Sequence, residues 1–119
     1  MRPRQITPHQ QWPSGDGQPL AVLRFEPAEL ATRYGLRFEA GYDNLDAYQR
    51  AALALPGGNQ VWLVRHQGNP EPGTVAYVDA AADLLRAKAF LMQTLGLVTA
   101  DFRWMAPGAA DPVAATGSW

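Results

Sequence analysis

The chain has 119 residues, and its ten Lys and Arg against eleven Asp and Glu leave a formal net charge of −1. This length suits a single domain, the lack of a basic surplus argues against a dedicated nucleic-acid binder, and the absence of cysteine excludes disulfides and thiolate zinc sites. No apolar run approaches the roughly 18 residues that a membrane span needs, and no apolar h-region marks a secretory signal. We therefore expect a cytoplasmic protein with no membrane partner.

Proline and glycine concentrate at both ends of the chain. Residues 1–20 contain four prolines and two glycines, and residues 107–119 contain two prolines among mostly small residues. Because proline fixes φ and donates no backbone hydrogen bond, we expect no regular helix or central strand in the first segment. The prediction is a Pro/Gly-rich arm over 1–20, one folded domain over 21–106 and a tail over 107–119, with Trp12 and Trp119 as anchors if an arm or tail docks.

A short helix is predicted over residues 26–35. Pro27 suits the first helical position, where a backbone N–H would have no helical partner. Gly35 suits a left-handed C-cap, and Leu36 then folds back as its apolar contact.

Weaker signals follow this helix. The alternation of apolar and polar residues in 36–40 predicts a half-buried strand. Residues 41–44 (Gly-Tyr-Asp-Asn) predict a turn. Residues 45–49 are ambiguous, and one helical turn is an option there.

The clearest local signal is a β-hairpin in which residues 51–55 and 60–66 are joined by Pro-Gly-Gly-Asn. A second turn over 68–73 leads to a strand over 74–78. The hairpin register decides which residues share a face. We favour an odd-numbered loop, which gathers the aliphatic residues Leu53, Leu55, Val61 and Leu63, and sets Ala52, Ala54, Trp62, Val64 and His66 on the other face. An even-numbered loop would pair Leu53 with Trp62 instead.

A long helix is predicted over 80–95, capped by Asp79 and ended by Gly96 with Leu97 as the fold-back contact. Its apolar stripe is Leu84, Ala87, Leu91 and Leu95. Residues 102–105 predict a last short strand. The fold class is therefore α+β: a small antiparallel sheet of about four strands in a meander, packed by a long C-terminal helix and a short N-terminal helix.

The strand over 60–66 is apolar on both sides, which is unusual for a sheet with one solvated face. Three explanations for its second face compete. The short helix or the N-terminal arm covers it, a second copy of the chain covers it, or a different partner binds there through Trp62 as an aromatic anchor.

The chain shows no recognisable catalytic constellation. His9 and His66 are the two histidines, Ser14 and Ser118 are the two serines, and nucleophile-elbow, phosphate-loop and HExxH patterns are absent. The carboxylates Glu39, Asp43 and Asp46 fit turn chemistry better than recognition of a basic partner or a Ca²⁺ or Mg²⁺ site. We expect no cofactor and no metal.

These observations favour a non-enzymatic protein-binding module of the immunity-like or adaptor-like bacterial type. Its partner is another protein, such as a toxin or a complex subunit, or a second copy of the chain. The predicted contacts are Trp62, His66 and the acidic turn with Tyr42, Asp43 and Asp46. On this hypothesis, replacing Trp62 by alanine leaves the fold intact and removes partner binding.

Two other functions remain open. The first is a small-molecule-binding protein or small enzyme with a pocket between sheet and helix, using Tyr48, Arg65, His66 or Tyr77. The second, which the charge disfavours, is a nucleic-acid contact through arginines such as Arg2 and Arg4.

Overall fold

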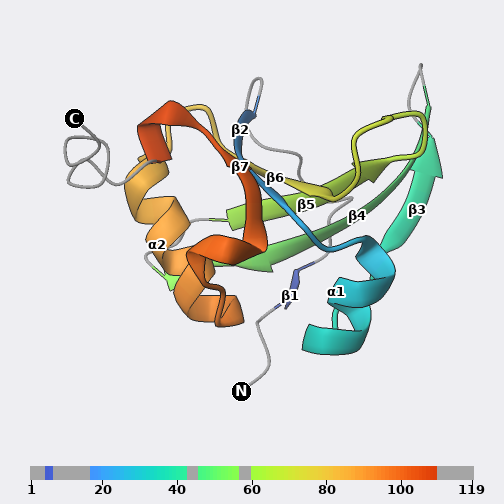
Figure 1. Cartoon of the computed structure of the whole chain (residues 1–119), viewed down its shortest axis with the longest axis horizontal. Helices are drawn as coiled ribbons and strands as arrows, with labels where there is room; N and C mark the ends of the chain where they lie inside the picture. The colour runs from blue at the N-terminus through green and yellow to red at the C-terminus, as the bar shows by residue number, and fades with distance from the viewer. Residues whose placement is uncertain (1–4, 7–16, 43–45, 57–59, 110–119) are drawn as a thin grey trace.

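The computed structural model describes residues 5–6, 17–42, 46–56 and 60–109. The predicted α+β class, with two helices and an antiparallel sheet, is confirmed (Figure 1). The elements in chain order are β1 (Gln5–Ile6), β2 (Gln18–Leu23), α1 (Pro27–Tyr34), β3 (Glu39–Tyr42), β4 (Ala47–Ala54), β5 (Gln60–His66), β6 (Thr74–Val78), α2 (Leu84–Leu95), the 3₁₀ helix η3 (Thr99–Asp101), β7 (Phe102–Met105) and the 3₁₀ helix η4 (Pro107–Ala109).

Within the described residues the sheet has seven strands in the order β1-β4-β5-β6-β2-β7, and β3 also pairs with β4. Every pairing is antiparallel. β3 pairs with the first half of β4, and β1 pairs with Ala52 and Leu53 in its second half. The two short strands therefore lie end to end along one edge of β4. The predicted meander is the series β3 to β6, but the expected count of about four strands is wrong because β1, β2 and β7 add to it.

The expectation that residues 1–20 hold no central strand is also wrong. β2 begins at Gln18 and lies between β6 and β7. Pro19 fits there because the register against β6 shifts between Pro19 and Ala21, and β7 pairs only with residues from Ala21 onward. Proline within a sheet is tolerated at such irregularities. Leu20 is fully buried, so the folded part begins before residue 21.

The ambiguous region before the hairpin is strand. β3 occupies 39–42 instead of 36–40, so Gly41 and Tyr42 belong to a strand and not to the predicted turn, and β4 begins at Ala47, where one helical turn was an option. Pairing with β5 explains the difference, because the first residues of β4 lie opposite the last residues of β5. Strand formation depends more on such neighbours than on local propensity. Asp43 and Asn44 lie outside the described residues.

The predicted hairpin register is confirmed. Ala54 pairs with Gln60 and Leu53 pairs with Val61. Residues 55–59 therefore form the loop, and their number is odd, as predicted. One face of the sheet, here called the helix face, contributes its aliphatic residues to the main core with Leu30 of α1 and Leu91 of α2. The opposite face, here called the far face, carries Ala52, Trp62 and Val64 in a second buried cluster.

Both helix C-caps follow the prediction. Gly35 has φ 70°, and its N–H donates to the carbonyl of Ala31 at 2.9 Å. Gly96 also has φ 70° and ends α2. Leu36 and Leu97, the residues after the two glycines, are both buried in the main core, as an apolar fold-back contact requires.

α2 begins four residues later than predicted, at Leu84. Its cap is Asp83, whose carboxylate accepts a hydrogen bond from the Arg86 N–H at 3.1 Å. Asp79 instead closes a separate turn by accepting from the Ala81 N–H at 2.9 Å. The amide of Gln18 donates to three carbonyls of this turn at 3.1 Å each, those of residues 79, 80 and 82, and so joins β2 to it.

Figure 1 shows both helices on the same side of the sheet, and the main core agrees, since it joins residues of α1 and α2 to the helix face. α1 therefore does not cover the far face, which removes one of the predicted covers. Of the helices in the described ranges, none has the length and apolar character to cross a membrane. Ala109 in η4 is fully buried, so the packed part of the chain extends past residue 106.

Candidate binding trough

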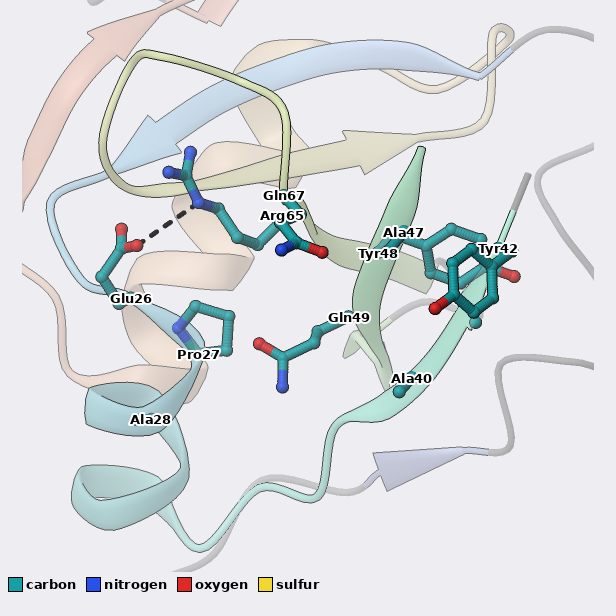
Figure 2. Close-up of a pocket in the computed structure, with 11 residues that line it drawn as sticks. Glu26, Pro27, Ala28, Ala40, Tyr42, Ala47, Tyr48, Gln49, Arg65 and Gln67 are labelled. Atoms are coloured by element: carbon teal, nitrogen blue, oxygen red, sulfur yellow. Dashed lines mark ion pairs between the residues drawn. The ribbon is translucent and has the colours of Figure 1, made fainter. Parts of the chain in front are cut away.

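A cavity of about 600 Å³ opens on the helix face beside the start of α1 (Figure 2). We call it the trough. Its wall comes from the start of α1 and its floor from β3, β4 and the end of β5. The lining residues are Glu26, Pro27, Ala28, Ala40, Gly41, Tyr42, Ala47, Tyr48, Gln49, Arg65 and Gln67.

Strand register places the floor residues side by side. Gln49 pairs with Arg65 on one side and with Ala40 on the other, and Ala47 pairs with Tyr42. Side chains of an antiparallel sheet alternate between its faces, so these residues share the helix face with Leu53 and Leu63. The trough is thus the part of the helix face that extends beyond the main core.

The wall is held by Glu26, the residue before α1. Its Oε1 lies 3.3 Å from Nε of Arg65, and its Oε2 accepts from the Gly73 N–H. Its own N–H donates to Oε1 of Glu29 at 3.2 Å. The same residue therefore fixes the first turn of α1, the end of β5 and the loop before β6, which sets the width of the trough.

Two arginines hold the loop between β5 and β6 beside this wall. Arg65 donates from Nη1 to the carbonyl of Glu71. Arg103 of β7 donates to the Pro72 carbonyl at 2.7 Å and pairs with the Glu71 carboxylate at 3.0 Å. The loop, which carries Asn69 and Glu71, is therefore anchored to two strands of the sheet, β5 and β7.

The lining is small and largely uncharged. Proline, three alanines and a glycine keep the trough open, Tyr42 adds aromatic surface, and Gln49 and Gln67 supply amides that both donate and accept hydrogen bonds. Tyr48 also lines the trough, but its ring packs on the far face. Figure 2 shows Gln49 reaching from the floor toward Pro27, while Arg65 extends to Glu26. Because Glu26 and Arg65, the acidic and the basic residue among the described lining residues, pair with each other, the trough suits an uncharged, partly apolar group.

Trp62, the main predicted contact, lies on the far face and not in the trough. It is 3% exposed and packs with Ala52, Val64, Tyr48 and Tyr77. A partner would reach the indole only by displacing neighbours. Its role in partner binding stays a prediction.

The other predicted contacts are divided between the two faces. His66 is half-buried on the far face, where its ring meets the edge of the Tyr48 ring at a centroid distance of 5.9 Å and an angle of 69°. Tyr42 is 84% exposed and lines the trough. The sequence-predicted site residues are therefore not brought together in one place.

Asp46 has a structural task. Its carboxylate accepts from the Ala47 N–H at 2.8 Å and from the Gly68 N–H, and so joins the start of β4 to the loop after β5. This agrees with turn chemistry. Asp43 lies outside the described residues, and within the described part of the chain no group of three or more His, Asp or Glu side chains is placed to hold a metal ion.

The alternative prediction of a pocket between sheet and helix named Arg65 and Tyr48, which line the trough, but also His66 and Tyr77, which belong to the far face. The ring of Tyr48 packs with these two on the far face. Gln49 and Gln67, which also line the trough, were not predicted from the sequence. The alternation of side chains along β4 and β5 was the available signal for Gln49. Once Gln49 is paired with Arg65, this alternation places Gln49 and Arg65 on the helix face.

A comparison of the chain with protein-family models, with curated proteins and with solved structures found no match.

Proposed function

We propose that this protein is a non-enzymatic, adaptor-like or immunity-like module that binds a segment of a partner protein in the trough. The observation that carries the proposal is the trough's construction: a cavity of about 600 Å³ floored by three strands and walled by a helix that an ion pair holds in place. A rigid hollow of this kind lowers the entropic cost of binding, because little of it has to order when a partner arrives.

The polar groups of the trough favour binding over catalysis. General acid–base or nucleophilic catalysis needs an ionisable group that is available to the substrate and a second group that activates it. The carboxylate of Glu26 is engaged by Arg65 and by the Gly73 N–H. The amides of Gln49 and Gln67 are suited to recognising peptide groups by hydrogen bonds.

Blocking the trough tests this proposal. Gln49 is an exposed floor residue, and Gln93 is an exposed residue of α2 that does not line the trough. The substitutions Gln49→Trp and Gln93→Trp make the same chemical change in the two places. As the probe we would use a phage-displayed library of random 12-residue peptides, selected on the immobilised full chain.

We expect enriched peptides that bind the wild type and the Gln93→Trp variant with similar Kd, and the Gln49→Trp variant at least tenfold more weakly. Circular dichroism and the melting temperature of each variant show that both are folded. Peptides that bind all three proteins equally, or a selection that enriches nothing, would refute the trough as a protein-binding site.

A second candidate function is the binding of a small molecule in the same trough. Its volume of about 600 Å³ falls in the range of roughly 300–1,000 Å³ that is usual for small-molecule sites. A thermal-shift screen against metabolites tests it, because a ligand of the native state raises the melting temperature. A compound that stabilises the wild type and Gln93→Trp but not Gln49→Trp would support this candidate.

A further inference from the structure

The direction of the backbone groups in β4 can be read from one hydrogen bond. The Ala47 carbonyl accepts from the Gln67 N–H at 2.8 Å, so it points toward the β5 side of β4. In an antiparallel strand the N–H and C=O of one residue point to the same side, and successive residues alternate. The groups of Ala47 and Gln49 therefore point toward β5, and those of Tyr48 and Arg50 point toward β3.

This alternation fixes the direction of the groups in β3. Tyr42 pairs with Ala47 and Ala40 pairs with Gln49, which are the two β4 residues whose groups point away from β3. These are non-hydrogen-bonded pairs. The N–H and C=O groups of Ala40 and Tyr42 therefore point outward, away from the sheet.

Among the described residues, no strand pairs with the outward edge of β3, and this edge adjoins the trough. Within the described ranges β3 pairs only with β4, and its residues Glu39, Ala40 and Tyr42 are exposed. The side chains of Ala40 and Tyr42 line the trough. Ala40 and Tyr42 thus present their backbone groups at the edge of β3, and their side chains line the trough beside it.

From this juxtaposition we infer that the occupant of the trough is an extended segment of a partner protein, which adds to β3 as a further strand. Its backbone pairs with Ala40 and Tyr42, and one of its uncharged side chains passes over Ala40 into the trough. This inference rests on the proposed function and names the form of the ligand. Strand addition takes affinity from main-chain hydrogen bonds and specificity from side-chain pockets.

Charge complementarity favours an uncharged side chain. The Glu26–Arg65 pair neutralises the charges at the wall, and the floor presents alanine and amide groups. Among the described lining residues, both charged groups are already paired, so a charged side chain that left water here would gain no ion partner from them, which is costly.

Hydrogen exchange of the full chain tests the edge geometry directly. In the free protein we expect fast exchange for the amides of Ala40 and Tyr42 and slow exchange for Gly41, whose groups point toward β4. When a trough-binding peptide from the library is added, protection of the Ala40 and Tyr42 amides should rise at least tenfold. Unchanged exchange of these two amides in the complex would overturn strand addition.

The substitution Ala40→Pro provides the second test. Proline removes the outward N–H but no bond to β4, and proline is tolerated on an edge strand when its nitrogen faces solvent. Ala40→Ser keeps the N–H and is the matched control. We expect Ala40→Pro to weaken peptide binding at least tenfold and Ala40→Ser to change it less than threefold.

The two proposals fail in different ways. Peptides whose binding is lost in Gln49→Trp but unchanged in Ala40→Pro, with Ala40 and Tyr42 amides unprotected, would keep the trough as the binding site and overturn strand addition. A selection that yields no trough-dependent peptide would overturn both. If Ala40→Pro does not fold, the exchange experiment on the wild type decides the question by itself.

Discussion

The Oε1 atom of Glu26 and the Nε atom of Arg65 lie 3.3 Å apart at the wall of the trough. Glu26 directly precedes α1, and Arg65 is the second-last residue of β5. The pair therefore joins the start of the helix to the sheet, and both of its residues line the trough. Because the Glu26 side chain is 42% exposed and the Arg65 side chain only 18%, water screens the interaction in part.

A double-mutant cycle measures what this ion pair contributes. We expect Glu26→Gln and Arg65→Met to show a coupling free energy of about 0.2–1 kcal/mol, the range for solvent-exposed pairs. Urea denaturation of the wild type, the single variants and the double variant gives the four free energies of unfolding. Arg86→Met on the exposed side of α2 is the control, with an expected change below about 0.5 kcal/mol. Additive effects of the two single changes would show that the pair does not hold the wall.

Glycine at position 73 is required by two separate constraints. Gly73 has φ +103°, and a Cβ atom there would lie 2.2 Å from the backbone oxygen of Leu23. We expect Gly73→Ala to lower the free energy of unfolding by about 3–4 kcal/mol, since backbone strain adds to a contact that cannot move aside.

Gly96→Ala is the matched control for this substitution. Gly96 has φ +70° with nothing within 4 Å of an added Cβ, so only the strain remains, at about 1–2 kcal/mol. The difference between the two variants in urea denaturation isolates the steric clash. Equal losses in the two variants would mean that the loop before β6 yields to the added methyl group.

Local signals in the sequence predicted the parts of the fold that local chemistry controls. The caps at Gly35 and Gly96 need only a left-handed residue followed by an apolar one, and both are observed. The hairpin register followed from gathering the aliphatic residues on one face, because a shift by one residue would have moved Trp62 among them.

Pairing between distant residues decided what the sequence could not predict. β2 contains Pro19 and becomes a central strand only because β6 and β7, more than fifty residues later, pair with it. The trough was missed for a related reason. Gln49 lines it only because β4 begins at Ala47, and that start depends on pairing with the end of β5.

Gln5 connects β1 to the segment that leads into β3. Its Oε1 accepts from the Arg37 N–H at 2.9 Å, and its Nε2 donates to the Arg37 carbonyl. We expect Gln5→Ala to speed exchange of the Arg37 amide by about fivefold, because a typical hydrogen bond contributes about 1 kcal/mol. Gln5→Glu keeps an acceptor for the Arg37 N–H and loses the donor to the Arg37 carbonyl. We therefore expect Gln5→Glu to speed exchange of the Arg37 amide less than Gln5→Ala does. NMR hydrogen exchange measures both, with the Ala51 amide inside β4 as the unchanged reference.

The burial of Trp62 reverses the expected result of its removal. The indole is 3% exposed within the far-face cluster, whereas Trp104 on edge strand β7 is 44% exposed. Removing a buried Trp side chain costs about 3–5 kcal/mol, through lost burial and the cavity left behind. We therefore expect Trp62→Ala to destabilise the fold by this amount in urea denaturation, and Trp104→Ala to cost about 1 kcal/mol or less. If Trp62→Ala instead keeps its stability and loses peptide binding, the binding surface lies on the far face and the trough proposal is wrong.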